Sequence, residues 1–203
     1  MCKNKNFEKF LSNIEPSTTT IEYISSVHNN MRKFLLNNEK YGGKIIETFL
    51  SGSYAKHTCI RPTKNGKKID VDIVVVTNYT ERDDSKEVLN ELYEICKEKY
   101  KKVTKQSRSI GVEMSGIQID VVPMIKCSTS NLYKIGSKED GTWYLTNPKG
   151  HLEWCTAVNK ENDFKFIKVV KIFKWWRKNN CPQNVKYPKG ITLEKIIADN
   201  LKV

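Results

Sequence analysis

Two acidic residues inside a β-branched run constrain this chain more than any other feature. A strand over residues 69–77 is predicted by the segment Ile69-Asp70-Val71-Asp72-Ile73-Val74-Val75-Val76, because β-branched residues favour extended backbone. Side chains alternate between the two faces of a strand, so Asp70 and Asp72 share one face. Neighbouring carboxylates repel each other and raise each other's pKa. Mg²⁺ relieves that repulsion and takes one or two carboxylates, with water and substrate phosphates completing its coordination.

A third acid decides between two interpretations of this pair. Two acids at a strand end are by themselves more often a solvated surface than a metal site. Here Asp120 lies in the middle of a second apolar strand, predicted over residues 117–125, and an unpaired buried carboxylate is costly. If the two strands are neighbours, Asp120 completes a cluster with Asp70 and Asp72. Such a cluster can hold two metal ions and activate a hydroxyl for in-line attack on a phosphate.

A glycine–serine turn precedes the paired acids. Gly52 and Ser53 follow a strand predicted over residues 44–50 and precede a short helix predicted over 55–58. Glycine lets the backbone approach a ligand closely, and the Ser53 hydroxyl and the amides of a following helix can bind phosphate oxygens. Most such pairs are ordinary turns, and the P-loop pattern is absent. The turn therefore indicates phosphate binding only in combination with the acids.

The remaining pattern predicts an α+β chain with a mixed sheet flanked by helices and a helical C-terminal part. Short strands over residues 103–106 and 110–114 precede the Asp120 strand, and Ser115-Gly116 forms a hairpin between the last two. Apolar spacing and capping residues predict the helices. They are expected over residues 5–14, from Ser17 to a stop at Gly42-Gly43, and over 84–100, 147–162, 164–179 and 191–201.

The helix predicted over residues 164–179 has an apolar and a basic side. The apolar set comprises Phe166, Val169, Val170, Ile172, Phe173 and Trp176, and the basic set comprises Lys168, Lys171, Lys174 and Lys178. One interpretation is an ordinary amphipathic helix with solvated lysines, and the other is phosphate contact by those lysines. Trp176 is expected in the core in both.

Charge and composition narrow the class of protein. The 203 residues carry 35 Lys and Arg against 23 Asp and Glu, a net charge of +12, which attracts polyanions. No apolar run approaches the roughly 18–20 residues of a membrane span, and no apolar segment follows the start as in a secretory signal. The six cysteines are scattered without a CxxC pair, so we expect free thiols, a cytoplasmic location and no membrane partner. His151 and Cys155, four residues apart, are weak evidence for a zinc site.

The order of these motifs resembles the polymerase-β-like nucleotidyltransferase superfamily. More narrowly, residues 52–62 (GSYAKHTCIRP) followed by Asp70-Val71-Asp72 resemble the CD-NTases. These are bacterial cyclic-oligonucleotide synthases related to cyclic GMP-AMP synthase and oligoadenylate synthase. Residues 119–123, 146–151 and 173–177 are similar to later segments of that family. The resemblance runs from about Phe49 to Arg177.

This resemblance implies a fold, a domain organisation and a set of site residues. The fold would be the polymerase-β-like one, with a catalytic core at residues 1–145 and the start of a C-terminal helical lobe at 146–203. The family continues into a longer lobe, so we expect a truncated chain. The implied residues are Asp70, Asp72 and Asp120 as catalytic ligands of two Mg²⁺ ions, with Mn²⁺ as an alternative, and Gly52, Ser53, Lys171 and Lys174 as nucleotide-binding residues. Asp120 would also help activate the acceptor hydroxyl.

The resemblance also implies an activity. The expected enzyme is a Mg²⁺-dependent nucleotidyltransferase that makes a cyclic di- or trinucleotide from NTPs (ATP, GTP or others) in CBASS-type antiphage signalling. Its partners would be a downstream effector reached through the product and an activating ligand or regulatory protein. Two alternatives stay open: another polymerase-β-like transferase acting on RNA or protein, and a basic RNA-binding module on this scaffold. The intact acid triad argues against the second.

Overall fold

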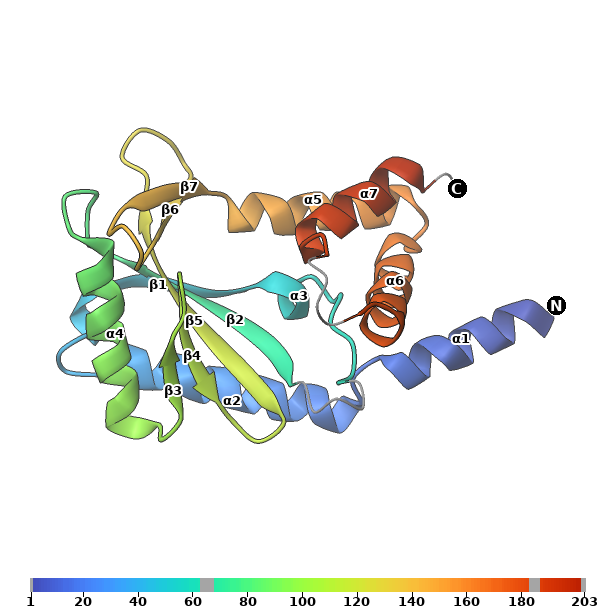
Figure 1. Ribbon diagram of the computed structural model, residues 1–203, viewed down its shortest axis with the longest axis horizontal. Coiled ribbons are helices and arrows are strands. Elements are labelled where there is room, and N and C mark those ends of the chain that lie inside the picture. The colour runs from blue at the N-terminus through green and yellow to red at the C-terminus, as the bar shows by residue number, and fades with distance from the viewer. Residues whose placement is uncertain (1, 63–67, 183–186, 202–203) are drawn as a thin grey trace.

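A mixed sheet and a group of helices lie side by side along the long axis of the molecule, with both chain ends at the helical end (Figure 1). The computed structural model describes residues 2–62, 68–182 and 187–201. The strands are β1 (Ile45–Ser51), β2 (Ile69–Thr77), β3 (Val103–Lys105), β4 (Ile110–Glu113), β5 (Ile117–Lys126), β6 (Tyr133–Gly136) and β7 (Trp143–Thr146). The helices are α1 (Cys2–Ile14), α2 (Thr18–Leu36), α3 (Gly52–Ala55), α4 (Ser85–Lys99), α5 (Pro148–Glu161), α6 (Phe166–Asn180) and α7 (Gly190–Asn200), with a 3₁₀ turn, η1 (Gly42–Lys44).

The sheet has the strand order β1-β2-β5-β4-β3, and β6 and β7 extend it from the far end of β5. Only β2 and β5 pair in parallel among the described strands, and all other pairs are antiparallel. A parallel pair needs a long crossover connection, and α4 with the β3–β4 hairpin supplies it. The two strands that carry the acids are therefore central neighbours with the same direction.

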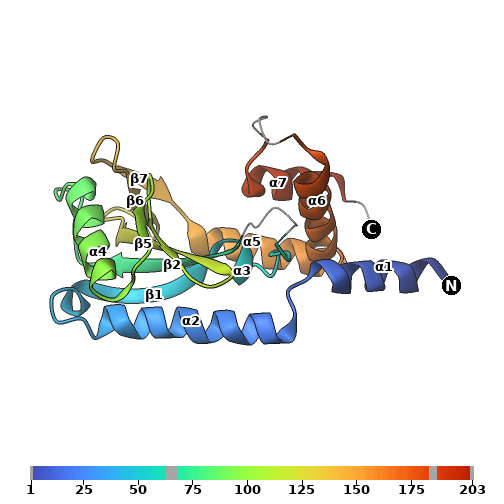
Figure 2. The same cartoon turned by 60° about the horizontal axis from the view of Figure 1, so that its bottom comes forward.

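Alternate residues of β2 are buried in two hydrophobic cores, one on each face of the sheet. Val71, Ile73 and Val75 face the larger core, where α2 and α4 cover the sheet (Figure 2). Val74 and Val76 face a smaller core on the other side. The α2 helix begins as expected at Ser17, whose hydroxyl accepts a hydrogen bond from the Thr20 amide. This packing fixes the direction in which the intervening acids point.

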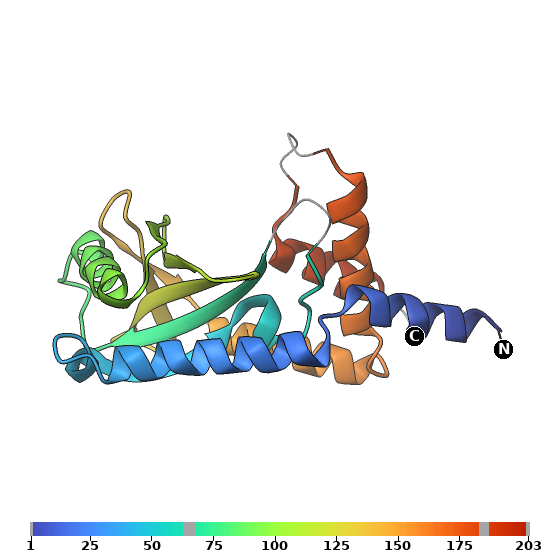
Figure 3. The same cartoon turned by 90° about the horizontal axis from the view of Figure 1, so that it is seen from below.

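The C-terminal helices form a lobe with a core of its own. Asn147 caps α5 by accepting from the Gly150 amide, and Pro148 occupies the first helical position. Cys155, Phe166, Val170 and Ile197 are buried together where α5, α6 and α7 meet. Figure 3 shows α6 rising beside the sheet, while α1 crosses near its foot and contacts it. The lobe thus stands next to the end of the sheet at which α3 lies.

Two features of the chain differ from the sequence prediction. Residues 133–136 and 143–146 form β6 and β7, where no element was predicted before the helix at residue 147. Each strand has only four residues, too few for an alternating pattern to be recognised. The α2 helix ends at Leu36 rather than at Gly42-Gly43, because Asn37 caps it with its backbone amide bonded to Lys33 and Leu35 carbonyls. The predicted boundary at residues 145–146 falls at the end of β7 and stays a prediction.

The described cysteines form no disulfide, as the sequence predicts. Cys59, Cys96, Cys127, Cys155 and Cys181 are free, and the side chain of Cys2 lies outside the described residues. Across the described ranges, no helix has the length and apolar character needed to cross a membrane.

Candidate metal and nucleotide site

The acids of β2 and β5 meet at one point of the sheet. In the parallel register, Asp72 lies opposite Asp120 and Asp70 lies opposite Gln118. The apolar residues on either side are buried in the cores, whereas Asp70 is exposed and Asp72 and Asp120 are half-buried. The condition set by the sequence, that the two strands be neighbours, is therefore met. The three carboxylates share one side of the sheet.

Two glutamines hold the Asp120 carboxylate in place. Gln106 Nε2 donates to Asp120 Oδ1 at 2.9 Å, and Gln118 Nε2 contacts the same oxygen at 3.3 Å. Sequence reasoning missed both residues. Gln118 could have been found, because it stands two residues before Asp120 and so shares its face of the strand. Gln106 reaches the site from the β3–β4 turn, and nothing in its local sequence indicates that.

Burial and mutual repulsion perturb the acids. Burial, together with the nearby Asp120 and Asp70 carboxylates, raises the pKa of Asp72 to about 6, and Lys56 opposes the shift. Burial also raises the pKa of Asp120, with Asp70 adding to the shift and the two glutamines opposing it. This is the signature of partly buried carboxylates that repel one another. An all-oxygen donor set under such repulsion fits Mg²⁺ or Mn²⁺.

The glycine–serine turn abuts the Asp72 carboxylate. Gly52 begins α3 directly after β1, with a φ of +66°, and Ser51 pairs with Asp72 across the β1–β2 ladder. A Cβ atom at Gly52 would lie 1.7 Å from Asp72 Oδ2 and 2.7 Å from its Cγ. Glycine is therefore required here for two reasons, the left-handed backbone and the space. The turn is built against the acid cluster, as a phosphate-binding turn beside a metal site must be.

A cavity of about 190 Å³ opens between the turn, the acids and the helical lobe. Its lining comes from the sheet side and from α6 and α7, and comprises Ser53, Thr58, Cys59, Ile60, Lys68, Ile69, Asp70, Lys174, Arg177, Lys178 and Gly190. Four of these residues are basic and one is acidic. Such a lining suits an anionic ligand that enters beside the acids. Ser53, Asp70 and Lys174, all predicted from the sequence, therefore lie on one cavity.

Lys174 sits at the inner wall of this cavity and is 8% exposed. Its ammonium donates to Thr58 Oγ1 at 2.7 Å and to Glu194 Oε1 at 3.0 Å. Burial lowers the pKa of Lys174, and Glu194 opposes that shift. Of the two interpretations of the basic face of α6, solvated lysines are therefore excluded at this position, and nucleotide contact by Lys174 stays a prediction.

The faces of α6 differ from the expectation in a second way. Its buried positions are Phe166, Val170 and Lys174, whereas Phe173 and Trp176 are 47% and 56% exposed. Trp176 is therefore not a core residue. The reason is that α7 packs against the face of α6 that carries Phe166 and Val170, and its Glu194 carboxylate accepts a hydrogen bond from Lys174.

Lys171 lies apart from the acids. It forms an ion pair with Glu15 at 2.6 Å and lines a different cavity of about 590 Å³ beside Tyr54 and Phe49. That cavity is lined in part by Tyr54 and Ala55 of α3. Nucleotide contact by Lys171 stays a prediction, and the structure gives it no place beside Asp70.

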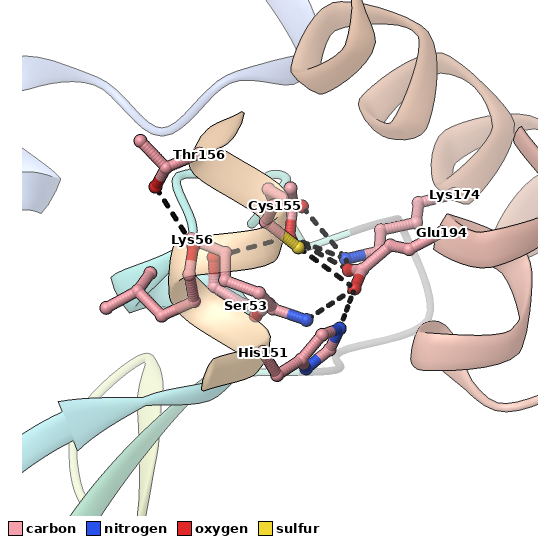
Figure 4. A network of polar contacts seen from close by, with 9 residues as sticks. Ser53, Lys56, His151, Cys155, Thr156, Lys174 and Glu194 are labelled. Atoms are coloured by element: carbon pink, nitrogen blue, oxygen red, sulfur yellow. Dashed lines mark hydrogen bonds and ion pairs between the residues drawn. The ribbon is translucent and has the colours of Figure 1, made fainter. Parts of the chain in front are cut away.

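His151 and Cys155 approach Glu194, with ligand atoms within 4.8 Å of one another (Figure 4). Both Glu194 oxygens already accept from ammonium groups, those of Lys56 and Lys174. Burial raises the pKa of the Cys155 thiol to about 11, and a zinc site needs the thiolate. The cluster is therefore an ion-pair centre that does not suit a metal.

Comparison with known proteins agrees with this geometry. Residues 1–159 match the family described as Second Messenger Oligonucleotide or Dinucleotide Synthetase domain. The chain is 38% identical over 205 residues to a protein of Acinetobacter sp. named cyclic AMP-AMP-AMP synthase, an alignment that covers 99% of this chain and 59% of that protein. The chain thus spans about three fifths of the length of that curated relative.

Solved structures share the fold. The Bradyrhizobium diazoefficiens CD-NTase CdnG, in complex with GTP, superposes with a TM-score of 0.78 at 12% identity, covering 95% of this chain and 69% of that one. CdnC of Escherichia coli MS115-1, with ATP, gives a TM-score of 0.70 at 22% identity, covering 96% and 64%. CdnC was also solved in a complex with HORMA-deltaN. These likenesses confirm the predicted polymerase-β-like fold with its mixed sheet and flanking helices.

Proposed function

Because this chain belongs to the family of second messenger oligonucleotide or dinucleotide synthetases, the CD-NTases, we propose that the protein joins nucleoside triphosphates into a cyclic oligonucleotide. One observation supports this most strongly. Asp72 and Asp120 stand opposite each other in parallel register while Gly52 abuts Asp72. We assign phosphate binding to this turn and metal binding to the carboxylates, and their adjacency supports transfer of a nucleotidyl group.

The acids would hold Mg²⁺, with Mn²⁺ as an alternative ion, and two ions match the three carboxylates. Asp72 and Asp70 from β2 and Asp120 from β5 are the ligands that we assign. Bound Mg²⁺ would polarise the transferred phosphate and lower the pKa of an acceptor hydroxyl. Gln106 and Gln118 keep the Asp120 carboxylate oriented toward its neighbours. A protein that orients these groups in advance supplies most of the catalysis in phosphoryl transfer.

The basic lining of the cavity would bind the triphosphate. Ser53 lies on the turn beside Asp72, and Lys174 and Arg177 face the same space from the lobe. ATP is the substrate that we propose first, because the Acinetobacter relative is named for an all-adenosine product. The relative named a CBASS oligonucleotide cyclase supports a role in antiphage signalling, in which the product would act on an effector. A HORMA protein is the kind of regulatory partner that the CdnC complex suggests.

Product analysis tests this function. The purified chain is incubated with all four NTPs and Mg²⁺, and products are identified by mass spectrometry after phosphatase treatment. We expect a phosphatase-resistant cyclic product that contains adenosine and disappears in Asp72→Asn. Asp199→Asn is the matched control, since Asp199 is an exposed acid of α7 paired with Lys195. A linear or absent product with intact Mg²⁺-dependent NTP binding would refute cyclisation by this chain.

A further inference from the structure

Glu194 is a fully buried carboxylate at the junction of the sheet and the lobe (Figure 4). It lies on α7 and accepts from Lys56, directly after α3, at 2.5 Å and from Lys174 of α6 at 3.0 Å. His151 Nε2 of α5 lies 3.3 Å from Glu194 Oε2. A single side chain thus connects the turn helix with all three lobe helices.

The charges around Glu194 do not cancel. Two buried ammonium groups, those of Lys56 and Lys174, share the Glu194 carboxylate. Lys56 also lies within range of the Asp72 carboxylate, whose pKa it lowers, so the excess positive charge of the group is centred on Lys174. A buried charge is costly unless it is paired. The unbalanced charge faces the cavity, because Lys174 forms part of its wall together with Ser53 and Asp70. An anion entering the cavity would complete the pairing.

Lys174 retains the capacity to contact such an anion. An ammonium group has three N–H donors. Two of them are used at short range, by Thr58 Oγ1 at 2.7 Å and by Glu194 Oε1 at 3.0 Å. The remaining contact, to the Thr58 carbonyl, is 3.4 Å long. Thr58 and Glu194 therefore fix the position of Lys174 while leaving one donor weakly engaged.

We propose that Glu194 is a positioning residue for nucleotide binding, which holds Lys174 at the cavity wall and ties it through Lys56 to the Gly52-Ser53 turn. The proposal rests on the proposed function, because it assumes that the anion is the phosphate chain of an NTP. Glu194 itself would not touch the nucleotide. It would act by keeping an ammonium from the lobe and the turn of the sheet at a fixed separation.

Steady-state kinetics with separate KM and kcat values test this role. Glu194→Gln keeps the shape but removes the charge and turns an amide N–H₂ toward one ammonium. We expect KM for ATP to rise by roughly 10-fold or more, the effect of a displaced charge-assisted hydrogen bond, while kcat changes much less. Glu194→Asp, which keeps the charge, should recover part of the affinity. A purely structural role would lower the active fraction and leave KM unchanged.

Glu47→Gln is the matched control. Glu47 of β1 accepts from Lys149 at 2.8 Å and from Tyr133 at 2.9 Å, away from the cavity. Glu47→Gln also removes an ion pair with a lysine, although a more exposed one, so its KM for ATP should equal that of the unmodified protein. An unchanged KM in Glu194→Gln, or an equal rise in Glu47→Gln, would overturn the positioning role.

A second variant covers the case in which Glu194→Gln does not fold. Thr58→Val removes the other short contact of Lys174 and introduces no charge, and KM should again rise several-fold. An unchanged KM there would overturn the proposal. Failure of the unmodified protein to bind ATP with Mg²⁺ would instead refute the proposed function, and the positioning role with it. The two failures are therefore distinguished by the unmodified protein alone.

Discussion

Replacing Gly52 by alanine should remove activity through a single collision. The new Cβ would lie 1.7 Å from Asp72 Oδ2, 2.7 Å from Cγ and 3.3 Å from Cβ. Because the whole carboxylate end is in conflict, rotating its terminal oxygens does not relieve the contact. The Asp72 carboxylate must retreat by more than an ångström. A misplacement of about 1 Å at a reacting centre costs roughly 10²-fold in rate.

The backbone adds a smaller and separate cost. Gly52 has a φ of +66°, where a side chain costs roughly 1–2 kcal/mol. In a domain of this size, each kcal/mol lowers Tm by about 2–4 °C. Gly116 offers a matched control, with a φ of +73° and no atom within 4 Å of an added Cβ. Both alanine variants should therefore carry this backbone cost, and Gly52→Ala should lose further stability through the collision with Asp72.

Mass-spectrometric product formation with ATP and Mg²⁺, together with thermal unfolding, separates the two costs. Gly52→Ala should lose at least 10²-fold in rate, and Gly116→Ala should lose only stability. Equal activities in the two folded variants would refute the claim that the turn is built against Asp72.

Three further predictions follow from the site. Since the folded pKa of Asp72, about 6, exceeds the unfolded value of about 3.9, the native state holds this proton more tightly. The contribution of Asp72 to stability without metal is then fully present below pH 4, and roughly 2–3 kcal/mol of it is lost as pH rises through 6. Urea titrations of the unmodified protein, compared at each pH with Asp72→Asn, should show this loss as a shrinking difference, and the Mg²⁺-loaded protein should not show it. Lys174→Ala should raise KM for ATP far more than Lys171→Ala, and equal rises would contradict the cavity assignment. Gly190→Ala should raise the free energy of unfolding by about 0.4–1 kcal/mol, because alanine restricts the unfolded chain and the nearest atom to the added Cβ is 4.0 Å away. A urea titration that shows a lower free energy of unfolding would contradict this prediction.

The elements that carry the acids could be predicted because their signals are local. The alternation in residues 69–77 predicts a strand with Asp70 and Asp72 on one face, and β2 has these bounds. Ser17, Asp84 and Asn147 act as helix caps near the predicted starts. Such patterns depend only on neighbours in the chain, and tertiary packing here agrees with them.

The contacts of the lobe could not be predicted in the same way. Glu194 reads in the sequence as an ordinary residue of an amphipathic helix, and Lys174 as one of several lysines on a basic face. Their burial results from the packing of α7 against α6, which brings together residues from separate helices. The outward position of Trp176 has the same origin. Charge pairs between separate helices produce no periodic pattern in the sequence, so only the three-dimensional structure reveals them.

The parallel pairing of β2 with β5 also has a consequence for the order in which the protein folds. The chain between Thr77 and Ile117, which contains α4 and the β3–β4 hairpin, must bring its two ends together before β2 and β5 can pair, and closure of long loops delays such pairings. Asp72 and Asp120 become neighbours only when that closure is complete. A cation that needs both acids therefore has no binding site in earlier states. Binding of that cation is therefore expected to slow unfolding and to leave the folding rate unchanged.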